Sequence, residues 1–93
     1  MTKLNATIFD DYSIPTHMQQ GLLDWINQGR LPGSFLTALL ENDFMAAVSS
    51  ADSMNAQRLK EYAQFIYSEA PSACHGSKEK VIAWQERFAT ATA

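Results

Sequence analysis

The chain has few of the residues on which several common classes of protein depend. Cys74 is the only cysteine among 93 residues, so an internal disulfide is impossible. The first thirty residues do not combine the basic start and the continuous apolar run of a signal peptide. No window approaches the roughly 18 apolar residues of a membrane span. We therefore expect a cytoplasmic protein without a membrane partner.

Positive charge is also scarce. Seven Lys and Arg stand against ten Asp and Glu, which gives a formal net charge of -3. The broad positive field that attracts phosphate backbones is missing, so we do not expect DNA or RNA as the partner. A small helix-turn-helix regulator stays an alternative, although Arg58 and Lys60 are the only cations on its expected third helix. The acidic excess is in turn too small and too mixed for a mimic of nucleic acid.

Apolar residues recur at helical spacing along most of the chain. The first such segment spans about 15–28, with Pro15 at its start and Gly29 placed to end it in the left-handed conformation. The second follows Gly33 and carries core residues, but Glu41-Asn42-Asp43 interrupts its apolar face. We expect this helix to bend or break near Asn42, and we favour a second helix cap there over a polar interface.

Two further helices complete the predicted fold. The third begins at an Asp52-Ser53 cap and ends before Pro71, and the fourth follows a cap at Ser77. The sequence thus predicts an all-α fold, a compact domain of four helices, or five with a break near Asn42, over residues 14–88.

The two ends of the chain carry weaker patterns. Residues 1–13 include a strand-like alternation around Ala6-Thr7-Ile8-Phe9, yet no second strand is available to pair with it. We interpret them as an extended N-terminal arm whose Ile8 and Phe9 dock on the helices. Small side chains fill residues 89–93, so we expect a disordered tail there.

The stretch "GRLPGSFL", residues 29–36, raises the question of a phosphate-binding loop. A P-loop needs a lysine and a preceding strand, and both are missing. What remains is a helix N-terminus at which Arg30, Gly33 and Ser34 form a candidate anion site for a small ligand or a nucleotide phosphate. The alternative, which we favour, is structural: Pro32 stiffens the corner, Gly33 relieves crowding and Ser34 caps the next helix.

Candidates for catalysis or metal binding are isolated. The spacing of Cys74, His75 and His17 does not match that of a zinc site, and the sequence has no second cysteine. The pair Asp10-Asp11 falls in the arm, where a fixed geometry is hard to hold. We therefore predict a protein that is not an enzyme, with no catalytic residue, no metal and no cofactor.

Aromatic residues point instead to protein binding. Trp25, Phe65 and Tyr67 fall off the stripes that we expect to face inward. Exposed aromatic groups mark contact surfaces, so these three residues and Arg30 form a candidate interaction surface. Packing beneath the N-terminal arm is the alternative, and a homodimer that closes spare apolar surface is another.

Three segments carry a resemblance: "IPTHMQQGLLDWINQGRLPGSFLTALLENDF" (14–44), "ADSMNAQ" (51–57) and "FIYSEAPSACHGSKEKVIAW" (65–84). Together they resemble a family of small helical proteins of unassigned activity encoded by tailed bacteriophages, prophages and mobile elements. The chain departs from the family pattern at Phe44-Met45 and at His75. The resemblance implies no catalytic residues. It implies a phage protein that binds and modulates a host or phage protein in the bacterial cytoplasm, as an inhibitor or adaptor that can include an anti-defence role.

Overall fold

Every regular element is helical in the computed structural model, which describes residues 5–91. The elements in chain order are the 3-10 helix η1 (Ala6–Phe9), α1 (Thr16–Gln28), α2 (Ser34–Leu40), α3 (Phe44–Ser50), α4 (Ser53–Ala56), α5 (Leu59–Glu69), the 3-10 helix η2 (Ser72–Cys74) and α6 (Lys78–Ala91). The predicted all-α fold is confirmed, with more and shorter helices than the four or five expected.

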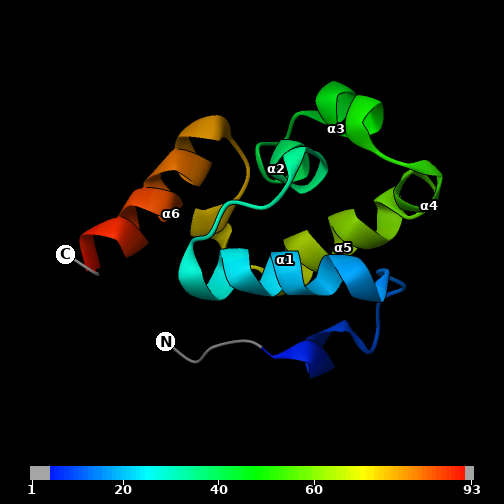
Figure 1. Ribbon diagram of the computed structural model, residues 1–93, viewed down its shortest axis with the longest axis horizontal. Helices are drawn as coiled ribbons and strands as arrows, with labels where there is room; N and C mark the ends of the chain where they lie inside the picture. The colour runs from blue at the N-terminus through cyan, green and yellow to red at the C-terminus, as the bar shows by residue number, and fades with distance from the viewer. Residues whose placement is uncertain (1–4, 92–93) are drawn as a thin grey trace.

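The helices form an angled array around one core rather than a parallel bundle. Figure 1 shows α1 running across the molecule, with η1 on one side of it, α2 and α3 on the other, and α6 at the end where α1 stops. The radius of gyration is 12.5 Å, close to the value of about 12 Å expected for a single domain of this length. None of the helices within residues 5–91 has both the length and the apolar character needed to cross a membrane.

The two tryptophans join the ends of this array. Trp84 on α6 donates its indole N–H to the carbonyl oxygen of Trp25 at 2.9 Å, and Trp25 donates its own to the carbonyl oxygen of Cys74 at 3.1 Å. Both side chains are buried. Each ring therefore buries a large apolar area while its one polar atom stays hydrogen-bonded, the condition for placing tryptophan in a core.

The predicted break near Asn42 is present and has a local cause. Asn42 adopts a left-handed φ of 62°. Its N–H donates to the Leu39 carbonyl at 3.1 Å, and that of Asp43 donates to the Ala38 carbonyl at 2.8 Å. This pair of bonds is a Schellman motif, which ends α2. Asp43 then caps α3 by accepting the Ala46 N–H at 3.1 Å, so the predicted second cap is confirmed.

The predicted third helix is divided into α4 and α5. Asp52 caps α4 as expected, by accepting the Asn55 N–H at 2.8 Å. The helix then stops at Ala56, and α5 begins at Leu59. No glycine or proline lies between residues 53 and 70, so the residue types do not indicate this interruption.

The arm packs as a turn of helix rather than as an extended piece. Residues Ala6–Phe9 form η1, in which the Asn5 side chain accepts the Thr7 N–H. The backbone hydrogen bonds of this segment are local, because the described residues 5–91 include no strand with which it could pair. Phe9 is buried and stacks on Phe65 of α5 with ring centroids 4.7 Å apart. The docking expected of Phe9 is confirmed, whereas residues 1–4 of the predicted arm lie outside the described residues.

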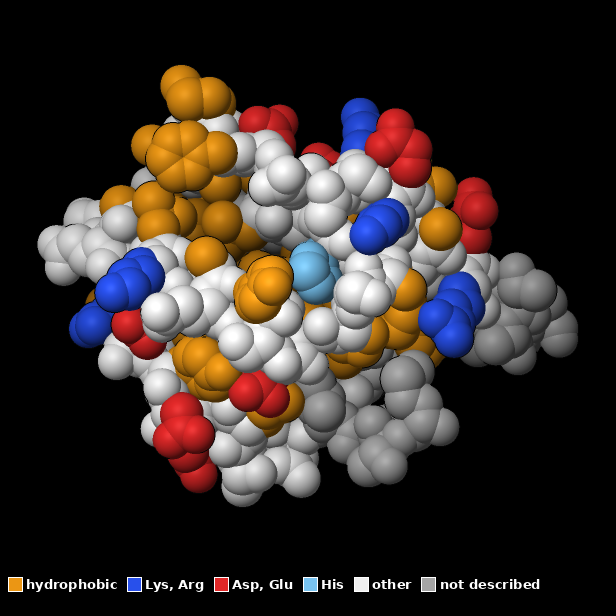
Figure 2. All heavy atoms as spheres, turned by 180° about the vertical axis from the view of Figure 1, so that it is seen from behind, with side chains coloured by type: hydrophobic (Ala, Val, Ile, Leu, Met, Phe, Trp, Pro, Cys, Tyr) orange, Lys and Arg blue, Asp and Glu red, His pale blue; other side chains and the backbone are white. Residues whose placement is uncertain are grey.

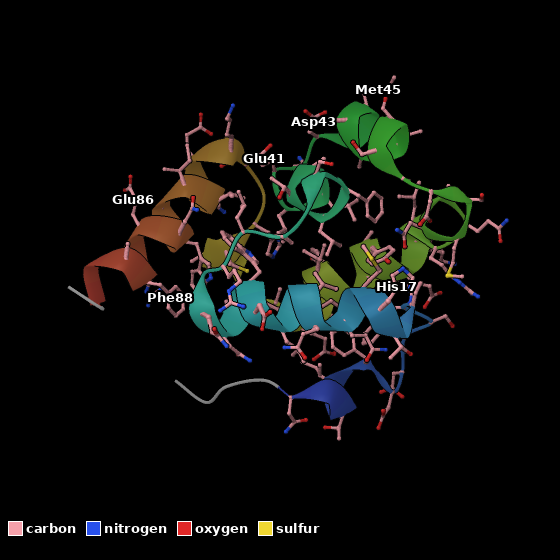
Figure 3. All side chains as sticks on the ribbon, in the orientation of Figure 1. His17, Glu41, Asp43, Met45, Glu86 and Phe88 are labelled. Carbon is pink, nitrogen blue, oxygen red and sulfur yellow. The ribbon has the colours of Figure 1, made fainter. Side chains whose placement is uncertain are left out.

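The end of α1 is set against α6. Gly29 has a φ of 67°, as predicted, and its N–H donates to the Trp25 carbonyl at 2.9 Å. A Cβ at Gly29 would lie 2.5 Å from Cδ2 of Phe88, whose side chain lies between α6 and the end of α1 in Figure 3. Ser77 caps α6 as expected by accepting the Lys80 N–H at 3.2 Å. The helix continues to Ala91, past the predicted boundary at 88, and residues 92 and 93 lie outside the described residues.

Candidate interaction groove

Two of the four residues predicted to form an interaction surface are in the core. The exposed fraction of both Trp25 and Phe65 is 0%, so the prediction that they line an exposed surface is wrong. Trp25 is enclosed where α1 meets η2 and α6, and Phe65 lies under the arm against Phe9 and Tyr12. The alternative of packing beneath the arm is therefore the correct one for Phe65.

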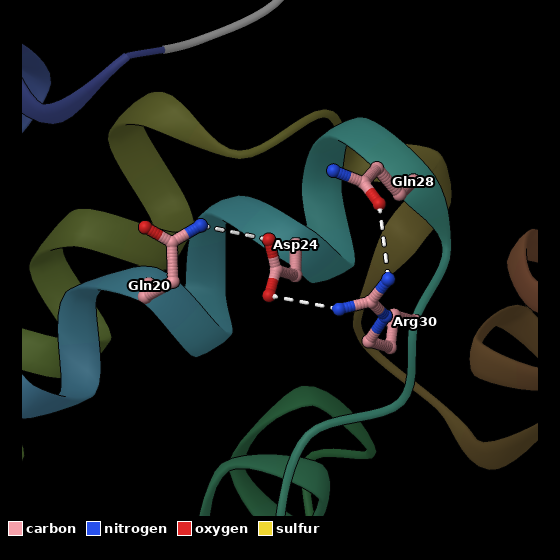
Figure 4. Close-up of polar contacts among 4 residues, drawn as sticks. All are labelled: Gln20, Asp24, Gln28 and Arg30. Atoms are coloured by element: carbon pink, nitrogen blue, oxygen red, sulfur yellow. Dashed lines mark hydrogen bonds and ion pairs between the residues drawn. The ribbon is translucent and has the colours of Figure 1, made fainter.

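The remaining two residues are exposed. Tyr67 on α5 is 87% exposed, the largest fraction among the exposed large hydrophobic residues of the described chain. The side chain of Arg30 is 70% exposed and turns back to α1. Its guanidinium lies 3.6 Å from an Asp24 carboxylate oxygen and donates a hydrogen bond of 3.5 Å to the Gln28 amide oxygen. Figure 4 shows both contacts.

This arrangement does not assemble the candidate anion site. Arg30 is directed at Asp24 and Gln28 rather than at the start of α2, and α2 has only seven residues. Gly33 is the N-cap residue, and Ser34 is the first residue of the helix. The prediction that Ser34 caps α2 is wrong. A Cβ at Gly33 would meet nothing within 4 Å, so crowding does not explain this glycine either.

The described chain carries an apolar groove that none of the sequence patterns indicated. It has a volume of about 420 Å³, within the range of roughly 300–1,000 Å³ typical of ligand pockets. We define the α3–α5 groove by the residues that line it: Leu39, Asn42, Asp43, Phe44, Leu59, Lys60, Ala63, Ile66, Tyr67, His75 and Gly76. Figure 2 shows the back face, where hydrophobic side chains gather beside a histidine, with both cationic and acidic side chains around them.

The walls of the groove follow from local structure. On α5, Lys60, Ala63 and Tyr67 recur at spacings of three and four residues and therefore share one face of the helix. The opposite wall is the turn at Asn42 and the start of α3. At one end the Gly76 N–H donates to the Leu40 carbonyl at 2.7 Å, which ties the segment before α6 to the end of α2.

Two of the exposed large apolar side chains, Phe44 and Tyr67, line this groove. Phe44 is 66% exposed on one wall and Tyr67 is 87% exposed on the other. Met45, next to Phe44, is 72% exposed and points away from the molecule in Figure 3. The helical spacing of the apolar residues places Phe44 on the inward face, together with the residues before the predicted break. The break at Asn42 changes the direction of α3, and the interruption by Glu41-Asn42-Asp43 was the only signal that could have revealed it.

The charges around the groove differ from the charge of the chain. Lys60 lines it, and a Cβ at Gly76 would lie 3.6 Å from Nζ of Lys80, so this second ammonium group lies against the lining. His75 lines the groove too. Burial lowers the pKa of its imidazole, and the nearby positive charge of Lys80 lowers it further. Among the described residues that line the groove, Asp43 is the only acidic one.

The residues weighed for metal binding or nucleophilic chemistry do not form a site. Cys74 is fully buried, and burial raises the pKa of its thiol to about 11, which leaves it a thiol at neutral pH. Over residues 5–91, no three His, Cys, Asp or Glu side chains come together in a way that could hold a metal ion. Asp10 and Asp11 are both exposed, at the end of η1.

Searches against protein-family models, curated proteins and solved structures gave no match to this chain.

Proposed function

We propose that this chain is a non-enzymatic binding protein of a bacteriophage or mobile element, and that it modulates a host or phage protein which docks in the α3–α5 groove. The observation that carries the proposal is the placement of Phe44 and Tyr67. Two aromatic side chains, each more than half exposed, line the same apolar groove, one from α3 and the other from α5. Such residues are the anchors that dominate the energy of protein interfaces.

The origin and the mode of action rest on other support. The phage or mobile-element origin is supported by the sequence resemblance over most of residues 14–84, in which "PGSFLTALLENDF" covers the turn that builds one wall of the groove. A bound protein would be modulated by occlusion of the surface that docks. An anti-defence role in the host cytoplasm is the specific form that we propose.

Affinity capture with matched variants tests this proposal. The purified chain and the double variant Phe44→Ser/Tyr67→Ser are used as bait in bacterial lysate, with Ile82→Ser as the control. Ile82 is 45% exposed on α6 and does not line the groove. Because all three side chains are exposed, the variants should keep the native circular dichroism spectrum.

The expected result is a protein retained by the wild type and by Ile82→Ser but lost from the double variant. Equal retention by all three baits, or retention by none, would contradict the proposal. Sedimentation of each bait alone provides a second readout. A dimer that dissociates only in the double variant would assign the groove to a second copy of this chain and would also contradict it.

A further inference from the structure

We propose that the segment which docks in the α3–α5 groove is an acidic amphipathic helix, with an apolar face that enters the groove and carboxylates that reach Lys60 and Lys80. This inference rests on the proposed function and specifies the chemistry of the partner. It follows from three features of the groove: its apolar lining, the absence of a strand among residues 5–91, and the two lysines that lie at it.

The floor of the groove selects an apolar side chain. Leu39, Leu59 and Ile66 contribute to the lining and are less exposed than Phe44 and Tyr67. A volume of about 420 Å³ accommodates more than one large apolar side chain. The occupant therefore presents two or more neighbouring apolar groups rather than a single one.

The backbone around the groove selects a helix over a strand. An extended peptide binds most firmly when it adds to the edge of a sheet, because its backbone groups then form a ladder of hydrogen bonds. The described part of the chain, residues 5–91, holds no strand that could offer such an edge. A helix satisfies its own backbone and presents apolar residues at positions i, i+3, i+4 and i+7, which suits a groove walled by helices.

The charges at the groove favour a partner helix with acidic residues beside its apolar face. The whole chain carries seven Lys and Arg against ten Asp and Glu, yet Lys60 and Lys80 both lie at the groove and Asp43 is its only acidic residue. Over residues 5–91, neither lysine forms an ion pair. Their ammonium groups are exposed and available to carboxylates of a partner.

Asp43 offsets only one of these two cations. Its Oδ1 accepts the Ala46 N–H at 3.1 Å and caps α3. A lysine or arginine of a partner would be attracted by this one carboxylate but repelled by the two groove lysines. Complementary charge of this kind gives specificity and orientation more than raw affinity.

Two synthetic peptides test the inference against the ¹⁵N-labelled full chain. Both are 15-residue helices with the same leucine and phenylalanine stripe, and they differ only in carrying glutamate or lysine at the flanking positions. Nuclear magnetic resonance titration follows the backbone amides. The expected result is that the glutamate peptide shifts the amides of Ala63 and Gly76, whereas the lysine peptide binds at least about fivefold more weakly.

Charge reversal supplies the matched control. Lys60→Glu/Lys80→Glu should weaken the glutamate peptide by at least about fivefold and should strengthen the lysine peptide. Lys78→Glu changes the same charge on α6 at an exposed position that does not line the groove, and should alter binding by less than about twofold.

Every other outcome contradicts the inference, and each can be told apart from a failure of the proposed function. Equal binding of the two peptides would show that charge does not select the partner, and absence of groove shifts with both would exclude an amphipathic helix. Sodium octanoate, titrated separately, would reassign the groove to a small amphiphile if it shifted the same amides more strongly than the glutamate peptide. The capture experiment with Phe44→Ser/Tyr67→Ser remains independent of all three results.

Discussion

The Tyr62 hydroxyl of α5 donates a hydrogen bond of 2.6 Å to Oδ1 of Asn55 in α4, inside the core. Asn55 is 4% exposed and Tyr62 is 0% exposed. The bond joins the two pieces of what the sequence pattern predicted as a single helix. The interruption between α4 and α5 is therefore coupled to a buried polar pair.

Tyr62→Phe should lower the free energy of unfolding by about 1–3 kcal/mol, because it leaves a buried Asn55 oxygen without its donor. Tyr67→Phe removes the equivalent hydroxyl from an exposed side chain and should change the free energy of unfolding by less than about 0.5 kcal/mol. Urea unfolding followed by circular dichroism measures both. Equal effects of the two substitutions would show that the buried bond contributes nothing specific.

Tyr62 should also make the fold sensitive to alkali. Burial, and then the charge of Asp52, raise the pKa of Tyr62 from 10.0 to about 12. Above pH 10 the unfolded chain therefore loses this proton while the folded chain keeps it, so folded stability falls as the pH rises from 10 to 12. The difference in unfolding free energy between the wild type and Tyr62→Phe should shrink over this interval. A difference that stays constant from pH 9 to pH 12 would contradict this assignment.

The sequence predicted helix ends best where one residue decides the backbone. Gly29 and Asn42 stand at left-handed positions that few other residues adopt, and Asp43, Asp52 and Ser77 cap the helices that follow. These signals are local, because they depend on the conformation of one residue and on hydrogen bonds within one turn. The all-α fold could therefore be predicted from the chain alone.

Packing between distant segments could not be predicted in the same way. Phe65 falls off the stripe that we expected to face inward on the third helix, yet Phe9 and Tyr12 cover it from a segment more than fifty residues away. Trp25 is buried by η2 and α6 for the same kind of reason. A single helical stripe assumes one buried face, whereas these helices are covered on two sides.

The groove was missed because it depends on the directions of the helices. Phe44 and Tyr67 are apolar residues on different helices, and periodicity does not show which of them lies inside. Only the turn at Asn42 sets Phe44 opposite α5. Of the candidate surface, Tyr67 alone is both exposed and part of the groove.

Asn42 therefore links stability to the proposed binding site. At its φ of 62° a residue with a Cβ is strained, and asparagine tolerates the conformation better than alanine does. Asn42→Ala should lower the free energy of unfolding by about 1–2 kcal/mol, whereas Asn42→Gly should keep or slightly raise it. Thermal unfolding of both variants measures the difference. Equal destabilisation by glycine and alanine would show that the asparagine side chain, rather than the backbone conformation, matters there.

The two glycines of the corner "GRLPGSFL" should respond in opposite ways. Gly29→Ala adds a methyl group that would lie 2.5 Å from the Phe88 ring, at a φ of 67°. We expect a loss of about 2 kcal/mol or more, since backbone strain and overpacking act together. Gly33 has an extended N-cap conformation with open space around it, so Gly33→Ser should raise stability by a few tenths of a kcal/mol by adding the missing cap.

The double variant Gly29→Ala/Phe88→Ala separates the two contributions at Gly29. Removing the Phe88 ring relieves the overpacking but not the backbone strain at the positive φ. In the Phe88→Ala background, Gly29→Ala should therefore lower the free energy of unfolding by about 1–2 kcal/mol. Urea unfolding of the four members of this cycle gives the coupling energy. If Gly29→Ala costs the same with and without the Phe88 ring, then the positive φ alone requires glycine at the end of α1, and the close approach of α6 plays no part.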